Sequence, residues 1–553
     1  MMLVGMGMSF LALLILCPFF GAMEVMLPTM LTGMLSGMVL GMAAVFGIVQ
    51  LAAAGLVAPA DDSMLADAAE QRNESLVRSL LKGGAAINLP QVDGMTALHW
   101  AVYHDDFEMA KLIVGAGADV AVENRYGVPP LSMAATNGNA NIVTVLLEAG
   151  ADPNTALRGG ETVLMTAART GSLGSVRALL AKGADPNAVE RRDQTALMWA
   201  AAEGHAAVVR TLVEVGADIH AKLKSGFTPM FFAVREGHAD VVHTLLEAGN
   251  NINELLRRVK DGPDRVVNNA SYRPVDDGIS PLIMAVRNGH FELAVALIHA
   301  GSDPNDQRSG FAPLHTMSWV RKPDESDRGD PAPIGSGRLT SLEFVREIVK
   351  LGADVNLRLE DGSPRQPNSA SRTNSGGATP FLLAADRADA ALMQLLIDLG
   401  ADPFTPNLDG TTPLMAAAGL GTAAPEEEAG TEPEALIATQ LMLDLGADID
   451  AVNADGDTAM HGAAYGSFPT VVDLLAAHGA DIRVWNTRNK QDRTPLFIAE
   501  GHRGGLPRPS RATIEVITML MDGAGVSTDG ERPEIVDQYA RPVAPPTPAE
   551  KKP

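Results

Sequence analysis

Apolar residues in the middle of the chain follow a block that repeats every 33 residues. In one block, residues 196–202 are small or apolar, and the apolar pairs 208–209 and 212–213 follow at the i, i+3, i+4 spacing of a helix face. The pairs predict the buried stripe of an outer helix. The alanine-rich run predicts a short inner helix that its neighbours can approach closely. Each block therefore predicts two helices joined by a turn.

Threonine, proline and glycine mark the ends of each predicted helix. A threonine or serine before the first apolar position can cap the inner helix, which is worth about 1 kcal/mol, and proline after it suits the first helical residue. Glycine supplies the left-handed residue that ends the outer helix, and Asp-Gly or Ser-Gly turns the chain into the next block. The capping position falls at Ser63, Thr96, Pro129, Thr162, Thr195 and Thr228. So constant a period predicts a solenoid.

These blocks resemble the ankyrin repeat, which is marked by Thr-Pro-Leu-His and a later Gly-Ala-Asp. The first motif is matched closely at residues 96–99, 312–315 and 458–461, and the second at 117–119, 183–185 and 216–218. The resemblance covers roughly residues 63–525 and implies an all-α ankyrin solenoid of about twelve helix-turn-helix units with short β-hairpin fingers. We expect the repeat array at 61–525, an apolar N-terminal helix within 1–60, and a proline-rich flexible tail at 526–553.

Five inserts interrupt the period after residue 253. Residues 254–276 and 357–375 fall between Gly-Ala-Asp or its counterpart and the next cap, so they lengthen the predicted fingers. Residues 319–340, 419–434 and 501–511 fall between the two helices of a unit. The two finger inserts contain similar short sequences and are slightly basic, which favours a common role in contacting a partner. Neutral drift is the alternative, because loops accept insertions at little cost.

The leader, residues 1–60, carries a single charge, Glu24. Residues 29–58 are almost wholly apolar and long enough to span a bilayer, and Ala58-Pro59-Ala60 is typical of a small-residue cleavage site. We favour export to the periplasm or out of the cell with cleavage after Ala60, as in the exported bacterial ankyrin proteins that the chain resembles. A retained membrane anchor, and translation from an internal methionine, stay open.

Composition excludes several chemistries. The formal net charge of −24 argues against nucleic-acid binding, and the single cysteine, Cys17, leaves the repeats without a disulfide or thiolate site. Seven of the twelve histidines occupy repeat positions and are interpreted as structural: His99, His315 and His461 in the first motif, and His205, His238, His290 and His502 in the turn between helices. The sequence shows no catalytic, phosphate-binding or dinucleotide motif, so we predict no enzyme, no cofactor and no metal.

The remaining candidate is a surface. In ankyrin-like arrays, partners bind the finger tips and the inner-helix face of a concave groove, and aromatic residues and arginine most often anchor interfaces. The inner-helix candidates are Tyr103, Arg169, Arg235 and Arg287; the tip candidates are Arg125, Tyr126, Arg158, Arg191 and Arg192; and the first finger insert adds Arg257, Arg258, Tyr272 and Arg273. Lys222, Lys224 and Trp485 are also expected at tips, whereas Trp100 and Trp199 are expected to pack between units.

These features predict a monomeric, non-catalytic scaffold in the cell envelope that presents a concave groove to a protein partner. The alternative is a membrane-anchored assembly or structural factor, whose leader stays in the bilayer while the array recruits a complex. The partner itself is not specified by the sequence.

Overall fold

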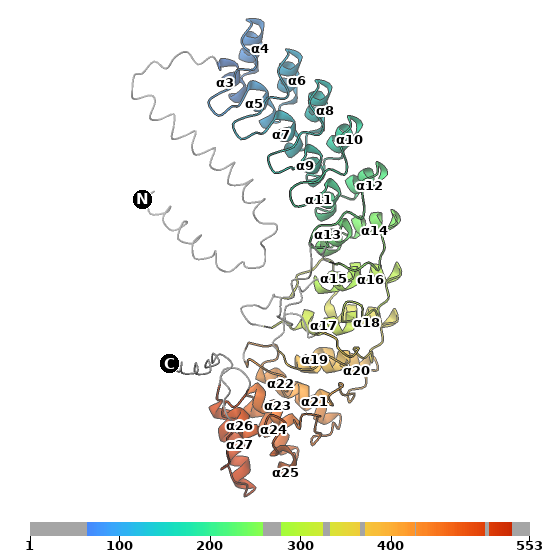
Figure 1. Ribbon diagram of the computed structural model, residues 1–553, viewed down its shortest axis with the longest axis vertical. Coiled ribbons are helices and arrows are strands. Elements are labelled where there is room, and N and C mark those ends of the chain that lie inside the picture. Colours follow the sequence, from blue (N-terminus) through green and yellow to red (C-terminus); the bar gives the residue numbers. More distant parts are fainter. Residues whose placement is uncertain are drawn as a thin grey trace, which may run out of the picture.

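The computed structural model describes residues 63–257, 278–324, 332–364, 371–425, 427–503 and 508–532. These residues form 25 helices stacked in single file along an arc (Figure 1), and no β-strand occurs among them. The predicted apolar helix within residues 1–60 lies outside the described residues. An all-helical stack of this kind confirms the predicted solenoid.

The helices alternate between an inner and an outer layer. The inner helices are α3 (Met64–Glu70), α5 (Ala97–Tyr103), α7 (Pro130–Asn137), α9 (Val163–Arg169), α11 (Ala196–Ala202), α13 (Pro229–Glu236), α15 (Pro281–Arg287), α17 (Pro313–Arg321), α19 (Pro380–Asp386), α21 (Pro413–Ala417), α23 (Ala459–Gly466) and α26 (Pro495–Ala499). The outer helices are α4 (Glu74–Lys82), α6 (Phe107–Gly115), α8 (Ala140–Glu148), α10 (Leu173–Ala181), α12 (Ala206–Glu214), α14 (Ala239–Glu247), α16 (Phe291–His299), α18 (Ser341–Lys350), α20 (Ala390–Asp398), α22 (Glu432–Asp444), α24 (Pro469–Ala477) and α27 (Arg511–Gly523). A further short helix, α25 (Ile482–Trp485), lies between the last two pairs.

Of the six predicted capping residues in the regular stretch, Thr96, Thr162 and Thr195 accept the expected hydrogen bond. Ser63, Pro129 and Thr228 begin their helices without a side-chain cap bond. The Thr195 hydroxyl accepts a hydrogen bond from the Met198 N–H at 3.3 Å and starts α11, and Thr96 does the same for His99 at 3.4 Å in α5. After the outer helix α12, Gly216 has φ = 89°, a conformation that residues with a Cβ rarely adopt. These local choices fix where each helix begins and ends.

The core is a continuous strip between the two layers. Leu197, Ala200 and Ala201 of α11 are fully buried, as are Val209 and Leu212 of α12. Each inner helix packs on the inner helices before and after it, and most outer helices do the same in their own layer. Stability in such an array comes chiefly from contacts between neighbouring units.

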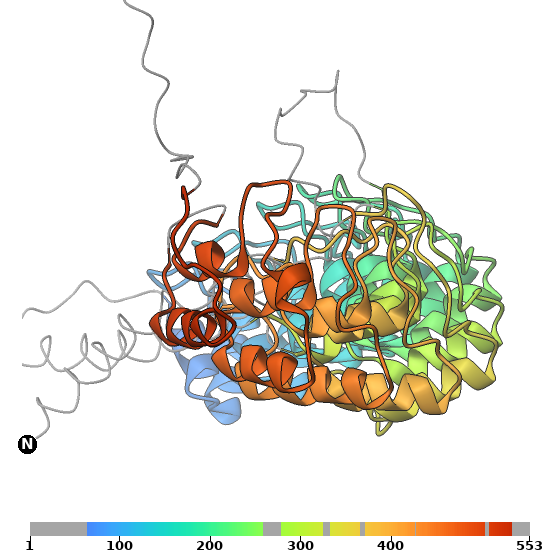
Figure 2. The ribbon, with the colours of Figure 1, turned by 90° about the horizontal axis from the view of Figure 1, so that it is seen from below.

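The fingers are tight turns. A few backbone hydrogen bonds close a finger, such as those from Asn124 N to Val128 O at 3.2 Å and from Leu223 N to Phe227 O at 2.9 Å. The described residues contain a single isolated antiparallel bridge, between Ala156 and Thr162. Because a finger spans so few residues, it cannot build a ladder of paired strands, and the predicted β-hairpins are not confirmed. Figure 2 shows the finger loops gathered along one edge of the array.

A line of asparagine side chains joins successive units. The Asn154 side chain accepts a hydrogen bond from Asp185 N at 2.8 Å and donates one to Gly183 O at 3.1 Å. Asn187 makes the same pair of bonds to the next unit. The sequence analysis missed this role, although the repeated Asp-Pro-Asn at 152–154 and 185–187 could have indicated it.

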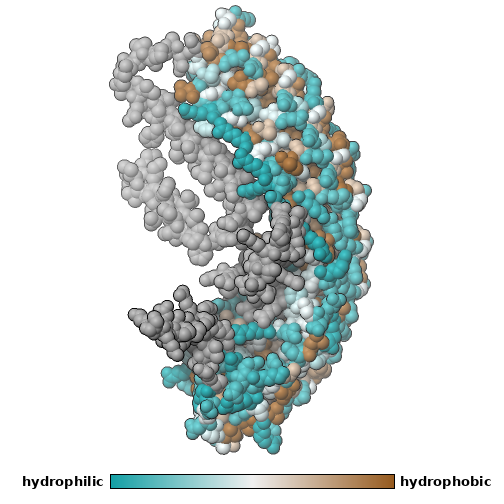
Figure 3. All heavy atoms as spheres, in the orientation of Figure 1, coloured by the Kyte–Doolittle hydropathy of each residue, from teal (hydrophilic) through white to brown (hydrophobic). Residues whose placement is uncertain are grey.

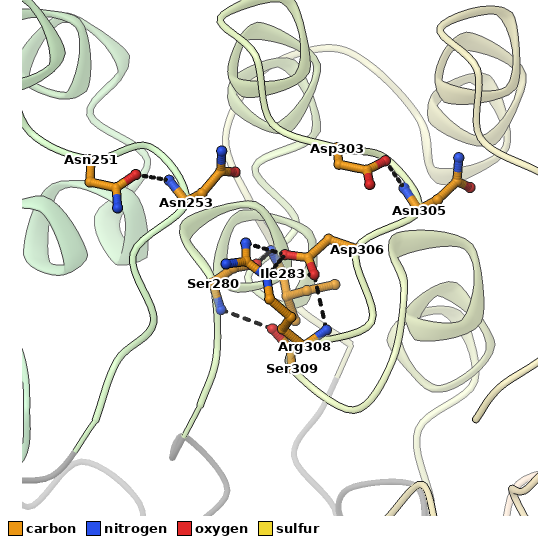
Figure 4. Close-up of polar contacts among 9 residues, drawn as sticks. All are labelled: Asn251, Asn253, Ser280, Ile283, Asp303, Asn305, Asp306, Arg308 and Ser309. Carbon is orange, nitrogen blue, oxygen red and sulfur yellow. Dashed lines mark hydrogen bonds and ion pairs between the residues drawn. The ribbon is translucent and has the colours of Figure 1, made fainter. Parts of the chain in front are cut away.

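This line is interrupted where the period breaks. Figure 4 shows matching turns in which Asn251 accepts from Asn253 N at 2.9 Å and Asp303 accepts from Asn305 N at 2.8 Å. Asn305 continues to the following unit through Gly352 O at 2.9 Å. Among the described residues, Asn253 has no such bond, and the buried Asn250 side chain has no hydrogen-bond partner. The junction between α14 and α15 is therefore less well satisfied than those before it.

The two finger inserts leave the array at equivalent points. Leu256 N donates to Ile279 O at 2.8 Å, and Leu359 N donates to Ala378 O at 3.0 Å. In both cases the glycine before the second residue bonds back to the leucine carbonyl. The flanks of both inserts are thus closed in the same way as an ordinary finger, which agrees with the prediction that the inserts lengthen fingers.

The inserts between helices have different limits from those predicted. Trp319 is the seventh residue of α17 and is buried against Phe311, with ring centroids 4.8 Å apart, so the first of these inserts begins after Arg321. Helix α22 already begins at Glu432, inside the second insert. The two errors have different causes. Trp319 packs against Phe311 and continues α17, whereas a capping box formed by Thr431 and Glu434 starts α22 inside the predicted insert.

The start of the predicted tail also contacts the array. The Arg532 guanidinium pairs with Glu500 at 2.7 Å and lies 4.8 Å from the centre of the Phe497 ring. Residues up to Arg532 therefore pack on the last helix pair, and residues 533–553 lie outside the described part.

Candidate partner-binding surface

Five finger tips carry a cation at the same register position. In each finger a backbone hydrogen bond closes a turn, such as the bond from Gly127 N to Asn124 O. The tip position is the residue directly after the one whose carbonyl accepts this bond, which is Arg125 in this finger. We call this set the fingertip row: Arg125, Arg158, Arg191, Lys224 and Arg257, each 33 residues after the last. All five are exposed.

Neighbouring tips are in direct contact. Arg125 N donates to Asp93 O at 2.9 Å, and Arg191 N donates to Gly159 O at 3.3 Å. A Cβ on Gly94, which has φ = 85°, would stand 2.5 Å from Arg125 N, so glycine is required at this close approach. The first contact joins Arg125 to the preceding finger, and the second joins the fingers of Arg158 and Arg191.

The arginine side chains of the fingertip row carry exposed charges. Within the described ranges, none of the guanidinium groups of Arg125, Arg158, Arg191 and Arg257 forms an ion pair, and Arg192 beside them forms none either. The Arg191 guanidinium donates a hydrogen bond to the carbonyl of Arg158, at 2.9 Å. The predicted tip residue Tyr126 is 58% exposed, and Lys222 is exposed too.

The row ends at the phase break. Arg308 occupies the equivalent position in the finger between α16 and α17, but its guanidinium is held by Asp306 at 2.7 Å (Figure 4). This contact lowers the pKa of the Asp306 carboxyl, although partial burial works in the opposite direction. The equivalent positions further on are Glu360, Leu408, Ala454 and Lys490. A continuous cationic edge therefore belongs to the first half of the array alone.

The inner-helix candidates are held by the protein itself. Arg169 lies between Glu161, at 3.2 Å, and the Trp199 ring, whose centre is 5.2 Å away. Arg235 lies 5.3 Å from the rings of both Phe227 and Phe232. Arg169, Arg235 and Arg287 are half-buried. They shape the face of the inner helices and are less exposed than the fingertip arginines Arg125, Arg158 and Arg191.

An aromatic group lies at the first end of this face. Tyr103 is 55% exposed and meets the Trp100 ring edge-on, with ring centroids 5.5 Å apart. The Trp100 indole N–H donates to Gln91 Oε1 at 2.7 Å, and the Trp100 ring also stacks on His104. Trp100 and Trp199 are both half-buried and packed against the core, so Tyr103 is the accessible member of this group.

One tip prediction is wrong, and three others lie outside the described residues. Trp485 is 3% exposed because α25 turns its side chain into the core. A short helix in this finger had no periodic signal in the sequence. Arg258, Tyr272 and Arg273 fall in residues 258–277, which the structure does not describe.

The motif histidines are structural. His99 and His461 are fully buried, and each ring Nδ1 contacts the hydroxyl of its capping threonine, at 2.8 and 3.0 Å. Burial lowers the pKa of His99 and lowers those of His315 and His461 to about 4, so all three are neutral at pH 7. His205, His238 and His290 each contact a backbone carbonyl near the end of the inner helix of the preceding unit, at 2.8–3.0 Å. The two sets join neighbouring units.

The charged residues of the C-terminal half face each other across the inserts. We call them the insert network: Arg321, Lys322, Asp324, Arg387, Asp389, Glu428, Glu434 and Arg503. Arg387 pairs with Asp324 at 2.5 Å and Arg321 with Asp389 at 2.8 Å, with both carboxylates buried. Lys322 pairs with Glu434 of α22, and Ala429 N donates to Asp324 at 3.3 Å. Residues more than one unit apart are thus tied together.

Two carboxyls in this half have raised pKa values. Burial raises the pKa of Glu428 to about 7, helped by Asp386 and Asp324 and opposed by hydrogen bonds from Ala423 N and Ala424 N. Burial also raises the pKa of Asp457 to about 6, although Asn489 donates to it. In the described ranges, no three His, Cys, Asp or Glu side chains come together in a way that could hold a metal ion.

The comparisons agree with this architecture. A family model described as "Ankyrin repeats (3 copies)" matches residues 40–124, 65–156, 105–190, 131–223 and 164–255, and one described as "Ankyrin repeat" matches 277–309. The chain is an ankyrin repeat protein. It is also similar to an ankyrin repeat-containing protein of Treponema pallidum (strain Nichols), at 31% identity over 127 residues, or 23% of this chain.

The Treponema protein is a relative over a limited stretch. This ankyrin repeat protein spans about a third of its length, 32%. The family is one of protein-interaction scaffolds in general, so the match supports binding as the role of the array. None of the described helices is both long and apolar enough to cross a membrane.

Proposed function

We propose that this ankyrin repeat protein is a non-catalytic scaffold that binds a protein partner along its first six helix pairs, α3 to α14. The observation that carries the proposal is the exposed fingertip row, which runs beside the aromatic and arginine residues of the inner helices. Side chains of these types commonly anchor protein interfaces. Figure 3 shows hydrophilic residues following this edge of the arc.

Position-specific photocrosslinking tests the binding surface. A photoreactive residue in place of Tyr126 reports on the tips, and the same residue in place of Val215 is the matched control, because Val215 is 48% exposed at the end of the outer helix α12. We expect one defined protein adduct from position 126 and none from position 215 in cells that make the protein naturally. Equal adducts from both positions, or none from either, would contradict the proposal.

We also propose that the scaffold works in the cell envelope. The support is the leader of residues 1–60, with its apolar stretch and its small-residue site at 58–60. Mass spectrometry of the mature N-terminus tests it: an end at Asp61 indicates an exported, periplasmic or secreted scaffold. An intact leader in the membrane fraction indicates the anchored assembly factor instead, and an intact leader in the soluble cytoplasmic fraction contradicts both.

The number of repeat units is part of the same proposal. We infer about twelve ankyrin units within residues 61–525, and the succession of helix pairs from α3/α4 to α26/α27 supports this division. Limited proteolysis of the full chain is expected to leave a resistant fragment that contains α5 to α14. Early cleavage inside the α5–α14 stack would contradict the assignment.

A further inference from the structure

The fingertip row contrasts in charge with the protein that carries it. The chain has a formal net charge of −24, yet cations occupy five successive equivalent positions, from Arg125 to Arg257. Their arginine side chains form no ion pairs in the part of the chain described. The first half therefore presents a line of positive charge along one edge of an acidic body.

The spacing of the row is set by the stack. Packed helices lie about 8–10 Å apart, and neighbouring tips touch through backbone hydrogen bonds such as that from Arg125 N to Asp93 O, so consecutive cations recur at about that interval. A polypeptide in the polyproline II conformation advances about 9.3 Å per turn of three residues. One side chain in every three would then face successive tips.

We propose that the fingertip row binds an extended acidic polypeptide segment with Asp or Glu at about every third residue. The inference rests on the proposed function and names the chemistry of the partner. Carboxylates of such a segment would meet the guanidinium groups of Arg125, Arg158 and Arg191 in register. Charge-assisted hydrogen bonds between guanidinium and carboxylate favour this pairing.

Other polyanions fit less well. A nucleic acid carries charge far beyond the five cations and would be repelled by the acidic body. A flat membrane surface fits poorly, because Figure 1 shows the fingers between α5 and α13 on the inner side of the arc. A flexible segment can follow that curved edge.

Fluorescence anisotropy with the full-length protein and two labelled peptides tests the proposal. The probe is five repeats of Glu-Ser-Pro, and the control has the same composition with its five glutamates in one block. We expect the spaced peptide to bind roughly tenfold more tightly at low ionic strength and to lose affinity steeply with salt. Equal or tighter binding of the block peptide, or no binding of the spaced peptide at millimolar concentration, overturns the proposal.

Matched variants locate the site. Arg158→Gln with Arg191→Gln removes two members of the row, whereas Arg177→Gln with Arg210→Gln removes two exposed charges from the outer helices of the same units. We expect the first pair of substitutions to weaken binding of the spaced peptide by roughly tenfold and the second pair to leave its affinity unchanged. Equal loss in both would indicate a diffuse charge effect and contradict the proposal.

Single-stranded oligothymidine and vesicles of anionic phosphatidylglycerol are the competing probes. Tighter, row-dependent binding of either one would overturn the assignment to an acidic peptide. A natural protein crosslinked at position 126 whose capture is unaffected by Arg158→Gln with Arg191→Gln would also overturn it, while leaving the proposed scaffold function intact.

Discussion

The two halves of the array use the same repeat differently. From α3 to α14 the period is constant, the fingers are short, and cations such as Arg158 and Arg191 are exposed without ionic partners. From α15 to α27 inserts interrupt the units, and charges such as Arg387 and Asp324 are buried against each other. The regular half has exposed arginines at its finger tips, whereas the irregular half pairs buried charges of its own units with each other.

The difference extends to how stability is distributed. In the first half, bonds such as that from Asn154 to Gly183 join only adjacent units. In the second half, Lys322 reaches Glu434 of α22, and Arg508 reaches Glu427 at 2.9 Å. We therefore expect the second half to open as a block and the first half to open more locally.

The largest expected effect comes from breaking the most buried ion pair. Arg387→Ala leaves the Asp324 carboxylate buried without this partner, and we expect a loss of about 3–5 kcal/mol. Hydrogen exchange should show increased opening of α17 to α24 and little change in α5 to α12. The double variant Arg387→Met with Asp324→Leu should recover most of the loss. A small effect, or one spread over both halves, would refute the block description.

The matching change in the first half is Leu197→Ala. Leu197 is fully buried in α11, so the cavity should cost about 2–5 kcal/mol. Because neighbouring units carry the stability, faster hydrogen exchange should centre on α9 to α14. Global loosening of the second half as well would show that the halves are coupled more strongly than their contacts indicate.

Acid should destabilise the second half through His315 and His461. Their folded pKa of about 4 lies below the ordinary value of 6.5, so the unfolded chain binds more protons between these values. Stability is fully present above pH 6.5 and falls as the pH drops towards 4, by roughly 3 kcal/mol for each histidine. His315→Gln, which can keep a donor towards Leu357 O, should remove its share of this dependence.

The raised pKa values of Glu428 and Asp457 act in the opposite sense over part of that range. The test is therefore the difference in free energy of unfolding between His315→Gln and the natural protein, measured by urea unfolding at several pH values from 4.5 to 7.5. An unchanged difference across this range would contradict the assignment of a buried neutral histidine.

A smaller gain should come from Ala312→Thr. His99 and His461 contact their capping threonines, but Ala312 gives His315 no such hydroxyl, and no described residue bonds its Nδ1. The added cap should stabilise α17 by about 1 kcal/mol. Thr458→Ala is the reciprocal control and should cost a similar amount in α23. A destabilised Ala312→Thr protein would indicate that the site is too tightly packed for the extra atoms.

The smallest effect on stability should follow removal of residues 258–277 and closure with a short glycine link. Their flanks are already joined through Leu256 and Ile279 at 2.8 Å, so unfolding should change by less than about 1 kcal/mol. Partner capture is the second measurement, and we expect it to weaken. Unchanged capture would remove this insert from the binding surface.

The sequence predicted the features that recur with the 33-residue period. It did not predict the contacts that fall outside that period. The caps at Thr96 and Thr195, the glycines after outer helices and the exposed tips Arg125 and Arg158 follow from local chemistry repeated in register. The pairing of Arg387 with Asp324 joins residues 63 positions apart through an insert, and no pattern marks it. The same limit explains the buried Trp485 and the underestimated length of α17.

The inner-helix arginines show an intermediate case. Their positions were predicted, but the stacking of Arg169 on Trp199 of the next unit depends on the distance between stacked helices. That distance is a tertiary quantity, so a list of exposed residue types could not separate engaged arginines from free ones. The distinction favours the fingertip row over the inner-helix candidates as the source of binding energy.

Hydrogen exchange of the full-length protein with and without its captured partner tests the central claim most directly. The account predicts slower exchange at the tips within residues 124–127, 157–160 and 190–193, with no change in α19 to α27. Protection confined to the C-terminal half, with the fingertip row unaffected, would contradict the division of labour between the two halves.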